Sequence, residues 1–334
     1  MDSKAGFSSW FAESRIRLTS ILSGPRVAIS KNWAEKVDNI SALPHIAAIG
    51  DSTITDFSCD SLLKMLIKVW GNKSSNWYLN SKKSNGINSM FERIDKKRPL
   101  IAYQYSTPGG EMDFEKKKLI RKLINKKTMS EQINQLIKRD RFPDLSLVWI
   151  GHSLLYWTKE VKSLDKDKRK SEISSILIKF RKEFQEQLER LCQKAIIQNG
   201  KRAILVFSLI NLEPLIRLRK IEEIKKIKNL SLYPYFNAMN EIFPSLNPEY
   251  RKETFKLSDN LNKEIKKSVD FLQDKYKQSN LKIVYSDVFT KANSRSIKTL
   301  SDSDGWHPSA FGHQQLARAA YPVIKKQLEF LGIL

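Results

Sequence analysis

The sequence predicts an α/β fold, built as a doubly wound parallel sheet with helices on both faces. Three observations support this prediction. Five short runs are almost continuously apolar, which is typical of strands buried on both faces. Segments with apolar residues at spacings of three and four lie between these runs, as expected for amphipathic helices. Turn-forming residues follow the clearest of these helices and lead into the next strand.

The five predicted strands are residues 45–49, 100–106, 145–150, 203–209 and 281–285. They are rich in aliphatic residues and lack the strict alternation of a strand with one solvated face. The clearest connecting helices are residues 173–195 and 257–276. A third amphipathic segment, residues 309–330, predicts a helix near the end of the sequence. The succession of strands and helices favours one parallel sheet.

The remaining segments define the expected domain organisation. Residues 1–43 are expected to form a helical or irregular arm, and residues 44–334 a single α/β domain. Two segments near 111–140 and 211–253 exceed what such a domain needs and are interpreted as insertions. The second insertion contains an aromatic stretch at 230–246. This stretch either packs on the body of the domain or covers a substrate pocket.

Composition favours a globular protein without a cofactor. Of 334 residues, 41% are hydrophobic, which is enough to fill a core. The sequence has neither a run of about 18 apolar residues nor a secretion-like N-terminus, so we expect a soluble, cytoplasmic protein. Cys59 and Cys192 do not form a disulfide or zinc pattern, and we expect both to be buried. The four histidines lack metal-ligand spacing, so we expect no metal or organic cofactor.

The chain is strongly basic. Its 59 Lys and Arg residues against 36 Asp and Glu give a formal charge of +23. Such an excess attracts nucleic acid, anionic membranes or acidic substrates without specificity. The lysines are scattered among acidic residues along helical faces, a pattern that favours a solvated surface over a specific nucleic-acid site.

Polar residues follow the predicted strands at the points where the strands end. In an open parallel sheet these points share one edge, where ligands bind. The motifs are Gly50-Asp51-Ser52, Ser106-Thr107-Pro108-Gly109-Gly110, Gly151-His152-Ser153, and a last loop with Asp304 and His307. Together they offer the nucleophile, base and orienting carboxylate that nucleophilic ester chemistry requires. His45 and His313 are interpreted as packing or surface histidines.

With these motifs the chain resembles the SGNH or GDSL-type hydrolase family from about Pro44 onward. The resemblance implies a flavodoxin-like, three-layer α/β/α sandwich around a five-stranded parallel sheet. It also implies that Ser52 is the nucleophile, His307 the general base, and Asp304 the carboxylate that orients His307. Asp51 immediately precedes the nucleophile, and we expect its side chain to face away from it.

The resemblance also implies an oxyanion hole. The glycine of the second block corresponds best to Gly109, with Gly110 as the alternative. The family has an asparagine in the third block where this sequence has Ser153. A serine hydroxyl can donate a hydrogen bond, but it is shorter and rotates freely, so we expect weaker stabilisation of the transition state. His152 is a possible substitute donor.

These motifs predict a serine hydrolase that cleaves a carboxylic ester through an acyl-enzyme on Ser52. The resemblance admits small-molecule, lipid or carbohydrate esters as substrates, and acyl transfer to an acceptor other than water. The alternative is a non-catalytic or weakly active module of the same fold that binds an anionic polymer or a membrane surface.

Overall fold

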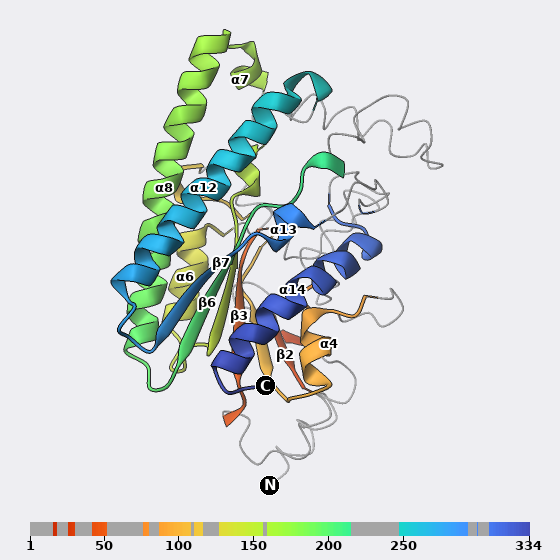
Figure 1. Ribbon diagram of the computed structural model, residues 1–334, viewed down its shortest axis with the longest axis vertical. Coiled ribbons are helices and arrows are strands. Elements are labelled where there is room, and N and C mark those ends of the chain that lie inside the picture. The colour runs from red at the N-terminus through yellow and green to blue at the C-terminus, as the bar shows by residue number, and fades with distance from the viewer. Residues whose placement is uncertain are drawn as a thin grey trace.

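The structure is a computed structural model of the 334-residue chain (Figure 1). It describes residues 16–18, 26–30, 42–51, 76–79, 87–107, 110–115, 127–155, 159–214, 247–292, 299 and 307–334. The aromatic stretch at 230–246, Cys59 and Trp157 lie outside these ranges.

A mixed sheet lies at the centre of the fold, with strand order β1-β2-β4-β3-β5-β6-β7 in the described residues. Its strands are β1 (Ile16–Leu18), β2 (Arg26–Ile29), β3 (His45–Gly50), β4 (Ile101–Gln104), β5 (Leu145–Trp149), β6 (Arg202–Phe207) and β7 (Leu281–Ser286). The five strands from β3 to β7 pair in parallel and match the predicted strands to within two residues at each end. The order β4-β3-β5-β6-β7 confirms the flavodoxin-like topology.

Two short strands extend the sheet beyond the prediction. β2 pairs antiparallel with β4, and β1 pairs antiparallel with β2. Both lie in the segment for which a helical or irregular arm was expected. With three and four residues they are too short to show a clear strand periodicity, and the pairing of β2 with β4 joins segments distant in the sequence. The division into an arm and a domain remains a prediction.

Helices cover both faces of the sheet (Figure 1). One face carries α6 (Met129–Ile137), α8 (Lys166–Ile196) and α12 (Arg251–Lys275). The other carries α4 (Met90–Asp95), α13 (Val288–Lys291) and α14 (Ala310–Phe330). The shorter elements are α7 (Lys159–Ser163) and the 3-10 turns η3 (Asp113–Glu115), η4 (His152–Leu155) and η7 (Pro248–Tyr250). The predicted helices correspond to α8, α12 and α14.

Two hydrophobic cores hold the three layers together. Side chains alternate across β3, so that Ala47 and Ile49 pack under α6, α8 and α12, while Ile46 and Ala48 pack under α4 and α14. This alternation explains why β3, β5 and β6 are apolar along most of their length, because both of their faces are buried, whereas β7 is buried only in part. The three-layer sandwich is therefore confirmed.

Other expectations concern single side chains. Cys192 lies on the buried face of α8, and this burial raises the pKa of its thiol to about 12. On exposed helix faces, lysines pair with acidic residues, as in Lys170–Asp167 at 3.2 Å and Lys325–Glu329 at 3.0 Å. No helix in the described ranges combines the length and the apolar character that a membrane crossing requires.

His45 packs at the start of β3, at the opposite end of the strand from Gly50. Its ring is buried edge-on against Tyr103, and neither ring nitrogen has a hydrogen-bond partner among the described residues. Burial, followed by the charges of Arg141 and its neighbouring arginines, lowers the pKa of His45 to about 3. The interpretation as a packing histidine fits this position.

This pKa predicts an acid sensitivity that His45→Phe should relieve. Below a pH of about 6.5 the unfolded chain binds a proton at His45, while the folded protein does not do so until about pH 3. Stability is therefore fully present above about pH 6.5 and falls as the pH drops towards 3, by about 1.4 kcal/mol per pH unit for this group. Urea denaturation at pH 7 and pH 5 should show a smaller loss in His45→Phe, by about 2 kcal/mol.

Two comparisons check that the loss of stability at low pH comes from His45. Between pH 7 and pH 8 His45 is neutral in both states, so the variant and the wild type should change in parallel there. Equal losses in both proteins between pH 7 and pH 5 would contradict the prediction.

Candidate active site

The described parts of the predicted motifs lie at the carboxyl ends of the parallel strands. Gly50 ends β3, Asp51 follows it, and His152 begins η4 just beyond β5. Ser52, Gly109 and Asp304 lie outside the described residues, so their positions and roles remain predictions.

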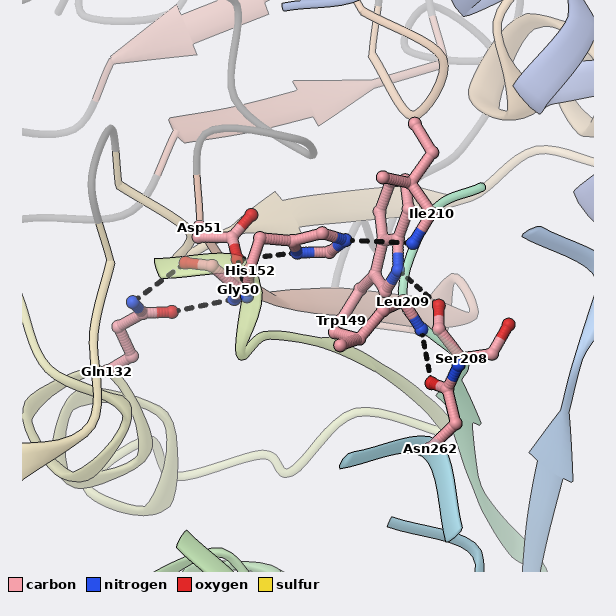
Figure 2. Close-up of polar contacts among 9 residues, drawn as sticks. All are labelled: Gly50, Asp51, Gln132, Trp149, His152, Ser208, Leu209, Ile210 and Asn262. Carbon is pink, nitrogen blue, oxygen red and sulfur yellow. Dashed lines mark hydrogen bonds and ion pairs between the residues drawn. The ribbon is translucent and has the colours of Figure 1, made fainter. Parts of the chain in front are cut away.

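The turn after β3 is held by a glutamine that the sequence analysis did not identify. The buried Gln132 of α6 accepts a hydrogen bond from the Gly50 N–H at 2.8 Å and donates its amide to the Gly50 carbonyl at 2.9 Å (Figure 2). This helix lies in the segment interpreted as an insertion. The sequence signal that could have identified Gln132 is a polar residue within the apolar stripe that Met129, Ile133 and Leu136 form on α6.

Gly110 provides a close backbone approach at the same turn. A Cβ at this position would lie 2.5 Å from the Gly50 carbonyl oxygen and 3.1 Å from the Asp51 Cα. The Gly110 N–H donates to the Thr107 carbonyl at 2.9 Å. Gly110 therefore serves the packing of the turn, and its N–H is already engaged within the second block.

Asp51 connects the first block to the third. Its buried carboxylate contacts His152, with Oδ2 lying 2.8 Å from Nδ1 and accepting from the His152 backbone N–H at 3.3 Å (Figure 2). The other ring nitrogen, Nε2, accepts a hydrogen bond from the Ile210 N–H at 3.1 Å. An acceptor at Nε2 places the proton of the neutral ring on Nδ1, from which it is donated to Asp51.

The third block turns sharply at Gly151. This residue has a φ of 117°, a region that side-chain-bearing residues rarely adopt, and η4 begins directly after it. Because both ring nitrogens of His152 are engaged, the ring is not free to donate to an oxyanion. The possibility that His152 substitutes for the family asparagine therefore finds no support in this arrangement. Ser153 follows it and is half-buried.

An aromatic layer lies beneath these turns. The Trp149 ring meets the His152 ring edge-on at 5.1 Å and the Trp77 ring at 5.7 Å. Trp149 is fully buried, and its indole N–H donates to the Ser208 carbonyl at 2.6 Å. The Trp77 backbone N–H donates to Nδ1 of His313 on α14 at 3.3 Å. The layer thus connects the third block to the helix that follows the last block.

His307 comes just before α14, the helix at which this connection ends. It is buried and sits three residues before α14. Burial, with a smaller contribution from His307, lowers the pKa of His313 to about 3, so His313 is a neutral packing residue. α14 also contacts α13, which follows the carboxyl end of β7.

The start of α14 is fixed by two contacts. Ser309 caps the helix by accepting the Gly312 N–H at 3.0 Å, and its own N–H donates to the Thr299 carbonyl at 2.8 Å. The helix begins at Ala310, so Pro308 lies before the cap residue and not in the first turn of the helix. These contacts fix the backbone two residues after His307.

The described residues hold no group of three or more histidine, cysteine, aspartate or glutamate side chains arranged to bind a metal ion. What they do assemble is a buried carboxylate bonded to His152, and tight turns with glycines at the carboxyl ends of β3 and β5, while the buried His307 stands just before α14. This fold and this placement define an α/β protein of the SGNH hydrolase type. The model of the GDSL-like lipase/acylhydrolase family matches residues 46–320, and the chain belongs to that family.

Two solved structures are distantly similar to the chain. The lipase Lip_vut3 from a goat rumen metagenome is 12% identical, with a TM-score of 0.46 over 85% of this chain and 97% of its own. The salicylyl-acyltransferase SsfX3 from a tetracycline biosynthetic pathway is 13% identical, with a TM-score of 0.42 over 89% of this chain and 57% of its own. No curated protein matches the sequence.

Proposed function

We propose that this protein is a serine hydrolase that cleaves carboxylic esters through an acyl-enzyme on Ser52. Its family supports esterase or acyltransferase activity in general. The observation that supports the proposal is that Asp51 and the third-block turn at Gly151, from distant parts of the sequence, lie at the carboxyl ends of neighbouring parallel strands. The buried His307 immediately precedes α14, whose His313 accepts a hydrogen bond from the aromatic layer beneath these turns.

In the proposed reaction His307 accepts the proton of the Ser52 hydroxyl as the oxygen attacks the ester carbonyl. Asp304 accepts a hydrogen bond from the other ring nitrogen of His307 and fixes its orientation. His307 then protonates the departing alcohol, which leaves the acyl group on Ser52. In the second half His307 takes a proton from water, the resulting nucleophile attacks the acyl carbonyl, and Ser52 regains its proton.

The proposed oxyanion hole uses backbone and side-chain donors. The Ser52 N–H and the Gly109 N–H are the backbone donors, and Gly109 is preferred because the Gly110 N–H already bonds to Thr107. Ser153 is the proposed third donor. Losing one such donor in a hydrolase costs about 2.7 to 4 kcal/mol of transition-state stabilisation, so a weak Ser153 contact leaves a slower enzyme and not an inactive one.

The substrate proposed is a small-molecule, lipid or carbohydrate ester, and the acyl acceptor is water or another hydroxyl compound. The proposal requires no metal or organic cofactor. A cytoplasmic location is part of it and rests on the sequence alone.

Labelling with a fluorophosphonate probe tests the proposal directly. The Ser52 oxygen should displace fluoride and form a phosphonyl ester, which peptide mass mapping locates at residue 52. Ser52→Ala should remain unlabelled, whereas Ser153→Ala retains the nucleophile and should still label. A probe adduct on another residue, or equal labelling of wild type and Ser52→Ala, would reject this mechanism. Absence of labelling together with retention on heparin at physiological salt would favour the binding module.

A further inference from the structure

We propose that His152 is a positioning residue, which fixes the nucleophile turn against the oxyanion turn by bonding to Asp51 on one side and to Ile210 on the other. This inference rests on the proposed function, since it concerns the geometry of the same site. We call Asp51, His152 and the Ile210 N–H the clasp.

The clasp joins three neighbouring strand ends. Asp51 follows β3, His152 follows β5, and Ile210 lies in the loop after β6 (Figure 2). The Asp51 and His152 side chains are each only 3% exposed, so water does not compete for their 2.8 Å contact. The 3.1 Å bond from the Ile210 N–H to Nε2 completes the connection. One imidazole thus sets the spacing of three turns.

The sequence positions of these residues give the clasp its relevance to the reaction. Asp51 directly precedes Ser52, and His152 directly precedes Ser153. A change in the contact between Asp51 and His152 therefore moves the backbone on which the proposed nucleophile and the proposed oxyanion donor stand. A misplacement of about 1 Å between such groups can cost about 100-fold in rate.

Several features hold the ring in one orientation. The edge-on contact with Trp149 packs one side of the ring, and Trp149 is anchored by its bond to the Ser208 carbonyl. The Ile210 N–H requires an acceptor at Nε2, and the Asp51 carboxylate requires a donor at Nδ1. With both nitrogens engaged, the ring has no free lone pair to accept the Ser52 proton. His152 therefore positions the site and does not act as its base.

Two substitutions separate the two bonds of the ring. In His152→Asn the amide nitrogen takes the place of Nδ1 and keeps the bond to Asp51, but nothing reaches the Ile210 N–H. In His152→Gln the amide oxygen takes the place of Nε2 and keeps the bond to Ile210, but nothing donates to Asp51. We expect His152→Gln to lower kcat by about 100-fold with little change in KM, and His152→Asn to retain most of the kcat of the wild type.

Asn262→Ala is the matched control. The Asn262 side chain accepts the Leu209 N–H at 2.8 Å and donates to the Thr290 hydroxyl at 3.2 Å, so this variant loses two bonds around the same β6 loop without touching Asp51 or His152. It should lower the melting temperature by a similar amount to His152→Gln and leave kcat near that of the wild type. The assay is p-nitrophenyl acetate turnover, with melting temperatures measured on the same samples.

Nitrogen-15 NMR of the histidine rings adds a readout that does not depend on turnover. The chain has four histidines, and the resonances lost in His152→Asn identify those of His152. At neutral pH they should show a protonated Nδ1 and an unprotonated Nε2, and the Nε2–H tautomer would overturn the inference.

The kinetic outcomes separate the inference from the proposed function. Equal kcat losses in His152→Gln and Asn262→Ala, or a greater loss in His152→Asn than in His152→Gln, would overturn the positioning role alone. A wild-type protein without ester turnover or probe labelling would overturn the proposed function, and this inference with it.

Discussion

Ser52→Ala is expected to lower kcat for an ester substrate by a factor on the order of 10⁶, and His307→Ala by a similar factor. The nucleophile and the base act as one unit, because the Ser52 hydroxyl is a weak nucleophile until His307 removes its proton. Asp304→Ala should cost less, on the order of 10⁴, since the imidazole remains present as the base but loses the carboxylate that orients it. Steady-state kinetics with p-nitrophenyl acetate measure all three effects.

The double variant Ser52→Ala/His307→Ala gives the sharper test. If the two groups act in the same step, the double variant should be no slower than either single variant. Losses that multiply would show that the two residues contribute independently, which contradicts the proposed unit. His45→Phe is the control, because it removes a histidine at the opposite end of β3 and should keep the turnover of the wild type.

Gly312→Ala is expected to destabilise the protein, although a general helix argument predicts the reverse. Gly312 lies in the first turn of α14, where alanine normally stabilises a helix by about 1 kcal/mol relative to glycine. Here a Cβ would lie 2.1 Å from the Thr299 carbonyl oxygen, so one of the two backbones must shift. We expect a net loss of about 1 to 3 kcal/mol, measured by urea denaturation.

The same substitution should reduce activity. The Thr299 carbonyl also accepts the N–H of the cap residue Ser309, two positions after His307. Moving Thr299 away from α14 therefore displaces the segment that carries the proposed base, with an expected loss of about 100-fold in kcat.

Gly332→Ala is a suitable control for this loss. Its φ of 71° makes alanine strained, but a Cβ there meets no atom within 4 Å, and the residue lies beyond the far end of α14. This variant should lose stability and keep its kcat. A Gly312→Ala protein that is more stable than the wild type, or equally active, would contradict the prediction.

Much of the fold could be predicted because its pattern is local. Each strand of the parallel part is apolar on both faces, so runs such as 145–150 and 203–209 stand out from the amphipathic helices around them. β1 and β2 could not be predicted in this way, since their few residues gain stability only by pairing, β2 with β4 and β1 with β2. The role of α6 was also missed, because the partner of Gln132 is backbone that lies 82 positions away.

In the candidate site, too, local motifs could be predicted from the sequence, whereas contacts between distant segments could not. The motifs around Ser52 and His307 could be recognised from residue types, order and position after strands. The Asp51 side chain is expected to face away from Ser52, and this stays a prediction because Ser52 lies outside the described residues. No sequence pattern shows that the Asp51 carboxylate meets His152, because that contact joins the ends of two strands. The preference for Gly109 over Gly110 came from the sequence and stays a prediction, and the structure adds only that the Gly110 N–H is engaged within the turn.

The sequence by itself determined the α/β class, the order of strands and helices, and the residue types available for ester chemistry, because these follow from local periodicity and from motifs read along the chain. Only the tertiary structure decided that Gln132 holds the Gly50 turn, that Asp51 bonds to His152, and that Gly312 must lack a side chain. Each of these depends on the distance between atoms far apart in sequence, which is set by the packing of helices on both faces of a twisted sheet.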